Sequence, residues 1–138
     1  MAPTVDINYF AVLAAAAASF VIGFLWHGPL FGKQWMKLMG VTEKSIKQMK
    51  LTPVQAMAGG FIATLLMSYI FAHFIDYAQA STIMEGIVAG LWIWLGFVAT
   101  IMLNGVLWEG RPFKLYLLNV SYHLVTLAVM GAILAVWV

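Results

Sequence analysis

Four long runs of apolar residues, separated by short polar segments, dominate the hydropathy pattern of this chain. They extend over about residues 9–27, 54–75, 83–108 and 113–138. A bilayer core about 30 Å thick needs about 20 largely apolar residues per helix, and each run reaches or approaches that length. The pattern therefore predicts an all-α integral membrane protein in which residues 1–138 form a single domain of four transmembrane helices.

Composition excludes the water-soluble classes of protein. Charged residues make up 9% and hydrophobic residues 64% of the chain, against about 25% and about 45–50% in soluble domains. So little charge cannot cover a surface that faces water, which argues against a soluble enzyme and against a nucleic-acid partner. The sequence has no cysteine, so a disulfide scaffold and a thiolate metal centre are excluded as well.

Positive charge is confined to two of the connections. Five lysines lie between the first two runs, and one arginine and one lysine lie between the last two: Lys33, Lys37, Lys44, Lys47, Lys50, Arg111 and Lys114. Lys and Arg concentrate in the cytoplasmic loops of membrane proteins. We therefore expect both termini to lie away from the cytoplasm.

The connection after the first run is long enough to hold structure of its own. We expect a short helix over residues 32–39 that ends at Gly40, and a second helix that has Thr42 as its N-cap and runs to about Leu51. Tryptophan, methionine and isoleucine alternate there with lysine, which is typical of amphipathic helices in the headgroup layer. The alternative is a solvated loop with a few buried methionines.

A nine-residue motif occurs at the ends of the first and third runs. Residues 23–31 (GFLWHGPLF) and 105–113 (GVLWEGRPF) share Gly, Leu, Trp, Gly and Phe without a gap. Both copies are expected at the same face of the membrane, which indicates a parallel repeat of two helix pairs. His27 and Glu109 are equivalent in that repeat and would form an interfacial polar pair. The alternative is that each of them is hydrated separately.

One ionisable residue is expected near the middle of the bilayer. His123 lies about 15 Å along the fourth helix, at 1.5 Å per residue, where such a group is costly and suggests a functional site. The candidate ligand- or ion-binding residues are His123, Asn119, Asn104, Tyr122 and Thr126. The alternative is a structural, neutral histidine held by its polar neighbours. In both cases we expect the ring to face the bundle interior and to hydrogen-bond to Asn119, Asn104, Tyr122 or water.

The sequence contains none of the common catalytic or nucleotide-binding motifs. It therefore predicts no enzyme activity, no catalytic residue and no cofactor. A three-histidine metal site is not expected either, because His27, His73 and His123 fall at different depths along their helices.

Three segments resemble a known family: residues 25–36 (LWHGPLFGKQWM), 94–100 (WLGFVAT) and 108–123 (WEGRPFKLYLLNVSYH). Together with the closing stretch from Gly131 (GAIL), they resemble the bacterial membrane family called domain of unknown function 1761. The resemblance covers nearly the whole chain and implies a small four-helix membrane protein. It implies no activity, ligand or catalytic residue.

Two classes of function fit these features best. In the first, a self-associating bundle binds or passes a small solute or ion through a polar interior lined by His and Asn. Conduction would need a homo-oligomer, and the small residues in 86–90 and 58–60 favour contact surfaces there. In the second, a non-catalytic accessory subunit packs against a larger membrane complex or lipids. A membrane enzyme, or a haem or quinone protein, is disfavoured because His123 has no evident partner histidine.

Overall fold

The computed structural model describes residues 7–40 and 52–137, together with residues 42, 44, 45, 48 and 50 of the connection between them. Four segments are long and apolar enough to cross a membrane: Tyr9–Leu30, Val54–Tyr77, Ile83–Leu107 and Phe113–Val136. These bounds lie within a few residues of those expected from hydropathy. The prediction of an all-α fold with four membrane-crossing helices is confirmed.

In chain order the elements are α1 (Tyr9–Leu25), η1 (Trp26–Leu30), α2 (Gly32–Met39), α4 (Pro53–Tyr77), α5 (Ile83–Ile93), η2 (Trp94–Ala99), α6 (Thr100–Met102), α7 (Asn104–Leu107) and α8 (Phe113–Val136). The elements η1 and η2 are π-helical turns. Three of the long helices begin at a polar cap whose side chain accepts a backbone N–H: Asn8 before α1, Thr52 before α4 and Thr82 before α5. Such caps satisfy donors that the first helical turn leaves free.

The short helix expected in the first connection is present as α2. It ends at Gly40, whose φ of 70° is readily adopted by glycine and makes a favourable C-cap. Lys33 and Lys37 are exposed while Trp35 is half-buried, so α2 is amphipathic as predicted. The second helix expected there falls largely outside the described residues, although Thr42 Oγ1 does accept a hydrogen bond from Ser45 N–H at 3.1 Å.

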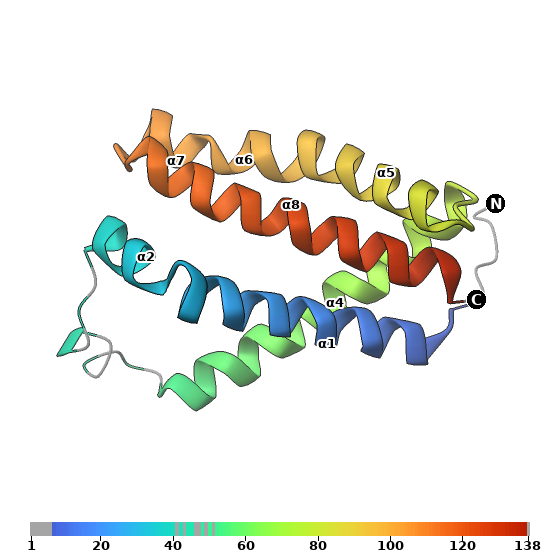
Figure 1. Cartoon of the computed structure of the whole chain (residues 1–138), viewed down its shortest axis with the longest axis horizontal. Coiled ribbons are helices and arrows are strands. Elements are labelled where there is room, and N and C mark those ends of the chain that lie inside the picture. Colours follow the sequence, from blue (N-terminus) through green and yellow to red (C-terminus); the bar gives the residue numbers. More distant parts are fainter. Residues whose placement is uncertain are drawn as a thin grey trace.

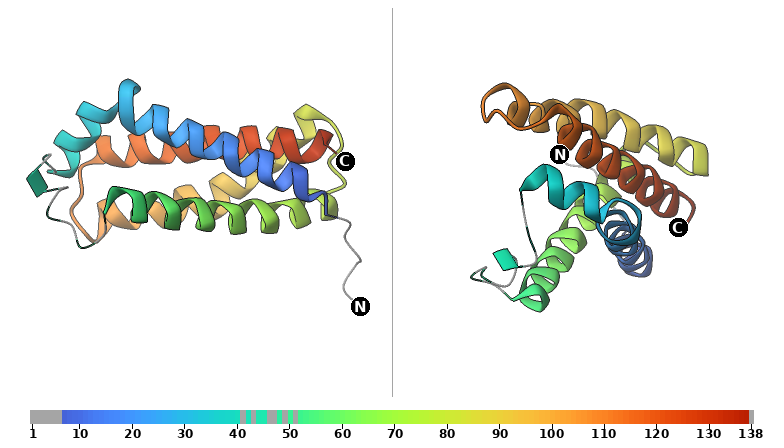
Figure 2. Two further views of the ribbon diagram at one scale, coloured as in Figure 1. Left: turned by 90° about the horizontal axis from the view of Figure 1, so that it is seen from below. Right: turned by 60° about the vertical axis from the view of Figure 1, so that its left-hand side comes forward.

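Helix α8 lies at the centre of the bundle. Figures 1 and 2 show it between α5 and α1, and it also contacts α4. Alanines of α1, Phe71 and Ile75 of α4 and Met130 of α8 form the core. All of them belong to the half of the bundle that also holds both chain ends (Figure 1). In that half the interior is closely packed.

Helices α5 and α8 approach until their backbones touch. A Cβ added at Gly86 would overlap the Gly131 carbonyl oxygen, and one added at Gly90 would lie 2.5 Å from the Leu127 carbonyl oxygen. Glycine is needed at both positions because a side chain would push the helices apart. The Gly86–Gly90 pair is therefore buried within the chain, and its predicted role as a contact surface between protomers is wrong.

Helix α4 is exposed along most of its length. It crosses behind α1 (Figure 1), and Ser68 Oγ donates to the Val12 carbonyl oxygen at 2.9 Å where the two helices meet. Towards its start the helix diverges from the bundle, and a Cβ added at Gly59 or Gly60 would meet nothing within 4 Å. This second small-residue surface is open.

The two helix pairs do not pack as a two-fold repeat would require. Helix α8 contacts α1, whereas α4, its counterpart in the repeat, makes no comparable contact with α5. The elements next to the two motif tryptophans, α2 and α7, do lie at the same end of the molecule (Figure 1). Their surroundings differ, because Trp26 Nε1 donates to the Leu118 carbonyl oxygen at 3.1 Å while Trp108 is 85% exposed. The duplication stays a prediction that rests on the motif.

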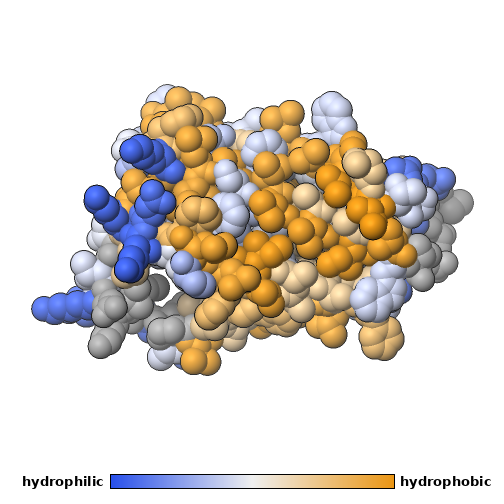
Figure 3. Space-filling view, in the orientation of Figure 1, coloured by the Kyte–Doolittle hydropathy of each residue, from blue (hydrophilic) through white to orange (hydrophobic). Residues whose placement is uncertain are grey.

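The surface divides into an apolar girdle and a charged end. Figure 3 shows apolar side chains along the bundle and hydrophilic ones at both ends, most of them at the end that holds α2. Each of the described Lys and Arg residues belongs to α2, to the connection after it, or to the α7–α8 turn and the start of α8. Both termini lie at the opposite end (Figure 1). This arrangement is that of an integral membrane protein with one basic end.

Candidate functional site

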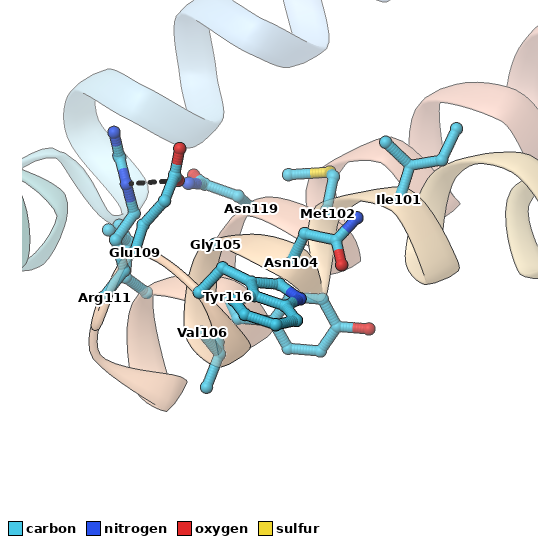
Figure 4. Close-up of a pocket in the computed structure, with 11 residues that line it drawn as sticks. Ile101, Met102, Asn104, Gly105, Val106, Glu109, Arg111, Tyr116 and Asn119 are labelled. Atoms are coloured by element: carbon cyan, nitrogen blue, oxygen red, sulfur yellow. Dashed lines mark ion pairs between the residues drawn. The ribbon is translucent and has the colours of Figure 1, made fainter.

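A polar pocket opens where the third membrane-crossing segment loses its regular helix. It has a volume of about 410 Å³ and lies between the α6–α7 region and the first turns of α8. Its lining residues are Ile101, Met102, Asn104, Gly105, Val106, Trp108, Glu109, Arg111, Leu115, Tyr116 and Asn119. Figure 4 shows these residues together. We call this space the asparagine pocket.

Two hydrogen bonds hold the interrupted segment against α8. The helix α5 passes into the π turn η2, and a further turn at Leu103 separates α6 from α7. Irregular helix shifts carbonyl groups out of the usual ladder. Tyr116 donates its hydroxyl to the Ala99 carbonyl oxygen at 2.9 Å, and the Trp94 indole N–H donates to the Val120 carbonyl oxygen at 2.7 Å. The break is thus positioned by side chains of both segments.

An ion pair borders the pocket at the α7–α8 turn. Arg111 Nε lies 3.3 Å from Glu109 Oε2, and both side chains are more than half exposed. Gly110 between them has a φ of +64°, which glycine adopts without strain. The Arg111 N–H donates to the Gly105 carbonyl oxygen at 3.0 Å. The backbone of the turn therefore places both charges beside the pocket (Figure 4).

Asn104 and Asn119 both line the pocket, as expected for residues at similar depths on the third and fourth helices. Asn119 is half-buried and Asn104 is exposed. Side-chain hydrogen bonds between the described helices come from other residues. Each carboxamide therefore keeps its N–H donors and its carbonyl acceptor for a ligand or for water.

His123 lies outside this pocket, in an aromatic cluster between α1 and α8. The Tyr122 ring lies 4.9 Å from the His123 ring and 4.9 Å from the His27 ring, measured between centroids. Both imidazoles thus pack against the ring of one tyrosine. Gly23 leaves the room for Tyr122, because a Cβ there would lie 2.8 Å from the Tyr122 hydroxyl oxygen.

His27 and His123 therefore lie closer in depth than the sequence predicted, since both rings pack against Tyr122. The backbone leaves the helical conformation at Gly28, with φ −114° and ψ −107°, so His27 does lie at the end of the first helix, as the motif predicted. Only His73 is remote, on α4, where its Nδ1 bonds to the Tyr69 carbonyl oxygen at 2.9 Å. Among the residues that the structure describes, no group of three or more His, Cys, Asp or Glu side chains could hold a metal ion.

Of the hydrogen-bond partners expected for His123, none of the protein side chains is one within the described residues, and a bond to water stays a prediction. The ring is half-buried, and within the described residues it bonds to none of Asn104, Asn119 and Tyr122. Aromatic packing holds it instead, because Tyr122 extends towards Gly23 rather than towards the imidazole nitrogens. Thr126 is fully buried with its hydroxyl oxygen unpaired, and it does not line the asparagine pocket.

The interfacial pair of His27 and Glu109 does not form either. His27 Nδ1 donates to the Gly23 carbonyl oxygen at 3.1 Å, and Glu109 pairs with Arg111. Sequence reasoning assigned Arg111 to membrane orientation alone and passed over Tyr116 as a candidate. Tyr116 stands three residues before Asn119 and therefore lies on the same face of the fourth helix. That spacing was the signal that could have identified it.

The family model described as "Protein of unknown function (DUF1761)" matches residues 10–135 of the chain. This match confirms the resemblance carried by the three sequence segments. Neither a curated protein nor a solved structure gives a significant match.

Proposed function

The chain belongs to the DUF1761 family, and we propose that it binds a small polar solute in the asparagine pocket. One observation carries the proposal: two carboxamides, from two different membrane-crossing segments, line one pocket that is bordered by an ion pair, and neither makes a side-chain hydrogen bond within the described residues. A volume of about 410 Å³ falls within the range of about 300–1,000 Å³ that is typical of small-molecule sites.

The polar groups favour a zwitterionic solute. Glu109 offers a carboxylate and Arg111 a guanidinium at the same edge of the pocket, so a ligand with both charges could contact each of them. Asn104 and Asn119 can donate to the ligand and accept from it. A solute that is only anionic or only cationic would lie beside one residue of opposite charge and one of like charge. Repulsion by the like charge lowers the affinity of the pocket for that solute.

The interrupted helix supports a binding role. Irregular backbone at membrane depth is tolerated where it lines a cavity or is buried in protein. Discontinuous helices of this kind form the solute sites of many transporters. Here the break between η2 and α7 coincides with the pocket, so the irregular backbone would form part of the binding site.

Binding is favoured over conduction by a single chain. Met130, Ser68 and Thr126 are at most 1% exposed, and together with the α5–α8 contact they fill the half of the bundle nearest the termini. Passage of a solute would therefore need a homo-oligomer, for which the open surface at Gly59 and Gly60 is the contact that we propose. We place the protein in a bacterial inner membrane with the pocket at the cytoplasmic face.

A second candidate function is that of an accessory subunit of a larger membrane complex. An apolar groove of about 530 Å³ separates α4 from α5 and η2, lined by residues that include Leu66, Phe74 and Phe97. These three side chains are exposed. A helix of a partner, or lipid, could fill this groove. Purification in mild detergent separates the two functions, since an accessory subunit would co-purify with other membrane proteins in fixed proportion.

Calorimetric titration of the purified protein in nanodiscs tests the solute site. We would titrate glycine betaine, 3,3-dimethylbutyrate and choline, which are of similar size and are zwitterionic, anionic and cationic. We expect the zwitterion to bind most tightly. We also expect Asn104→Leu combined with Asn119→Leu to weaken binding at least tenfold, because both polar contacts are lost, as about 1 kcal/mol or more per hydrogen bond implies.

Gln48→Leu and His123→Gln serve as controls. Gln48 lies at the same end of the bundle, and His123 lies next to the pocket without lining it, so both variants should bind as the unmodified protein does. If the double asparagine variant binds all three solutes unchanged, the proposal is wrong. Loss of binding in His123→Gln alone would move the site to the aromatic cluster.

A further inference from the structure

A second groove, on another face of the basic end, has a different chemistry. It lies between α2 and the first half of α8 and has a volume of about 550 Å³. Its lining residues are Trp26, Phe31, Gln34, Lys37, Leu38, Lys114, Leu117, Leu118 and Ser121. It shares no lining residue with the asparagine pocket. We call it the α2–α8 groove.

The groove is basic and polar above an apolar wall. Lys37 comes from α2 and Lys114 from the second position of α8, so two elements each contribute one positive charge. The described residues that line it include no acidic side chain. Glu109, on the α7–α8 turn, already pairs with Arg111 at 3.3 Å. Within the described part of the chain, an anion in the groove would therefore meet two lysines that have no acidic partner.

The apolar wall is fixed in place. The Trp26 indole N–H donates to the Leu118 carbonyl oxygen at 3.1 Å, and the Trp26 ring packs on Phe31 with centroids 4.8 Å apart. Tryptophan is enriched at the membrane interface, where an apolar ring and a polar N–H are both satisfied. Trp26 therefore marks the level at which headgroups meet acyl chains.

The length of the groove matches the upper part of a lipid. Lys114 and Ser121 are seven residues apart on α8, or about 10 Å along the helix at 1.5 Å per residue. Since α8 begins at Phe113, Lys114 lies at the headgroup level and Ser121 lies deeper. A ligand in this groove would place its anionic group by the lysines and its apolar part along Leu117 and Leu118.

We propose that the α2–α8 groove binds one anionic phospholipid, whose phosphate lies between Lys37 and Lys114 and whose acyl chain follows the wall formed by Trp26, Phe31 and Leu117. Basic pockets beside membrane helices on the cytoplasmic face are a recurring mode of recognition for anionic lipids. The amphipathic helix α2 closes the groove from the side of the headgroups. Bound lipid would in turn hold α2 against α8.

Native mass spectrometry of the intact protein with added lipid tests this proposal. Phosphatidylglycerol and phosphatidylcholine of identical acyl chains would be titrated in detergent. We expect preferential retention of phosphatidylglycerol by the unmodified protein. We expect Lys37→Gln combined with Lys114→Gln to weaken that retention at least tenfold, since each lysine near a phosphate contributes about fivefold.

A matched charge control separates the groove from general surface charge. Lys33→Gln combined with Lys44→Gln removes the same charge from exposed positions that do not line the groove, and retention should stay within twofold of the unmodified protein. Equal losses in the two double variants would overturn the proposal. So would equal retention of the two lipids.

A second pair of variants tests the acyl chain. Leu117→Ser lies in the groove and Leu95→Ser lies on the exposed girdle outside it; only the first should reduce retention. Millimolar inorganic phosphate should not displace the lipid. Displacement by phosphate, with no effect of Leu117→Ser, would show a site for a soluble anion and would contradict a lipid site. Circular dichroism would confirm that each variant keeps its helix content.

Discussion

Single polar side chains inside the bundle differ in whether they have partners. Ser68 is completely buried and donates to the Val12 carbonyl oxygen, which joins α4 to α1. Thr126 is just as deeply buried, but its hydroxyl oxygen has no partner. Unpaired buried hydroxyl groups lower stability, whereas paired ones contribute modestly. The two residues should therefore respond in opposite ways to the loss of their hydroxyl groups.

We expect Thr126→Val to raise the free energy of unfolding by about 1 kcal/mol, because a methyl group of similar size replaces an unpaired hydroxyl. Ser68→Ala should lower it by about 0.5–1.5 kcal/mol through loss of the bond to Val12. Unfolding by sodium dodecyl sulfate, followed by circular dichroism, measures both. A marked loss of stability in Thr126→Val would mean that the hydroxyl does have a partner, and loss of solute binding would restore Thr126 as a ligand-binding candidate.

Helix pairs in this bundle are held together by different contacts. Helix α1 and helix α4 meet through side chains, whereas α5 and α8 meet backbone to backbone at Gly86, Gly90 and Gly131. Lipid provides no hydrophobic drive for association between helices, so close approach through small residues is an effective way to gain packing energy. The rigid α5–α8 pair is also the support from which the interrupted segment around η2 continues.

Replacement of Gly86 by leucine should destabilise the bundle by at least about 1–3 kcal/mol, because the new side chain would collide with the backbone of α8. Gly96→Leu is the matched control. A side chain at Gly96 meets open space, and leucine has the higher helix propensity by about 0.5–1 kcal/mol, so this variant should be neutral or more stable. Thermal unfolding followed by size-exclusion chromatography gives both values. Equal stability of the two variants would contradict the backbone contact.

Gly60→Leu tests the proposed self-association of the protein. We propose the open surface at Gly59 and Gly60 as the contact between protomers, and a leucine there would obstruct it. The mass of the detergent complex, determined by light scattering, should fall from that of an oligomer to that of a monomer. An unchanged mass would exclude this surface as the contact.

The whole molecule is polarised along its long axis. The described Lys and Arg residues lie at one end and both termini lie at the other (Figures 1 and 3). The asparagine pocket and the α2–α8 groove both belong to the basic end. A single orientation in the membrane would therefore expose both sites to the same compartment.

Single cysteines can establish that orientation, because the chain has none of its own. Lys44→Cys lies at the basic end and Ser81→Cys lies in the connection before α5, and both positions are exposed. We expect an impermeant maleimide to label Ser81→Cys in intact spheroplasts and Lys44→Cys only after lysis, since positive charge favours the cytoplasmic face. Labelling of both positions from one side would contradict the four-span topology.

Local signals in the sequence were sufficient to predict the helices and several of the residues at which they end. Apolar runs located the four membrane-crossing segments, and Gly40 marked the end of α2. Asn104 and Asn119 were identified because polar residues are costly in an apolar run. Their joint presence in one pocket followed from similar depths on consecutive antiparallel helices.

Other features depended on contacts between distant residues. The sequence correctly placed His27 at a helix end before the kink at Gly28, but it did not predict that His27 and His123 would both pack against Tyr122. The repeated motif suggested equal packing of two helix pairs, yet α8 alone became central. A shared motif indicates that two turns have similar local chemistry. It does not determine which helix faces pack against each other.

Taken by itself, the sequence determined the number and length of the apolar helices and the confinement of Lys and Arg to alternate connections. Those properties follow from the transfer of each segment into lipid and need no knowledge of its neighbours. The tertiary structure decided where backbone touches backbone at Gly86 and Gly131, where the third segment breaks, and which polar groups share a pocket. These depend on shape complementarity between residues far apart in the chain, because helices in lipid associate through close packing and hydrogen bonds rather than through hydrophobicity.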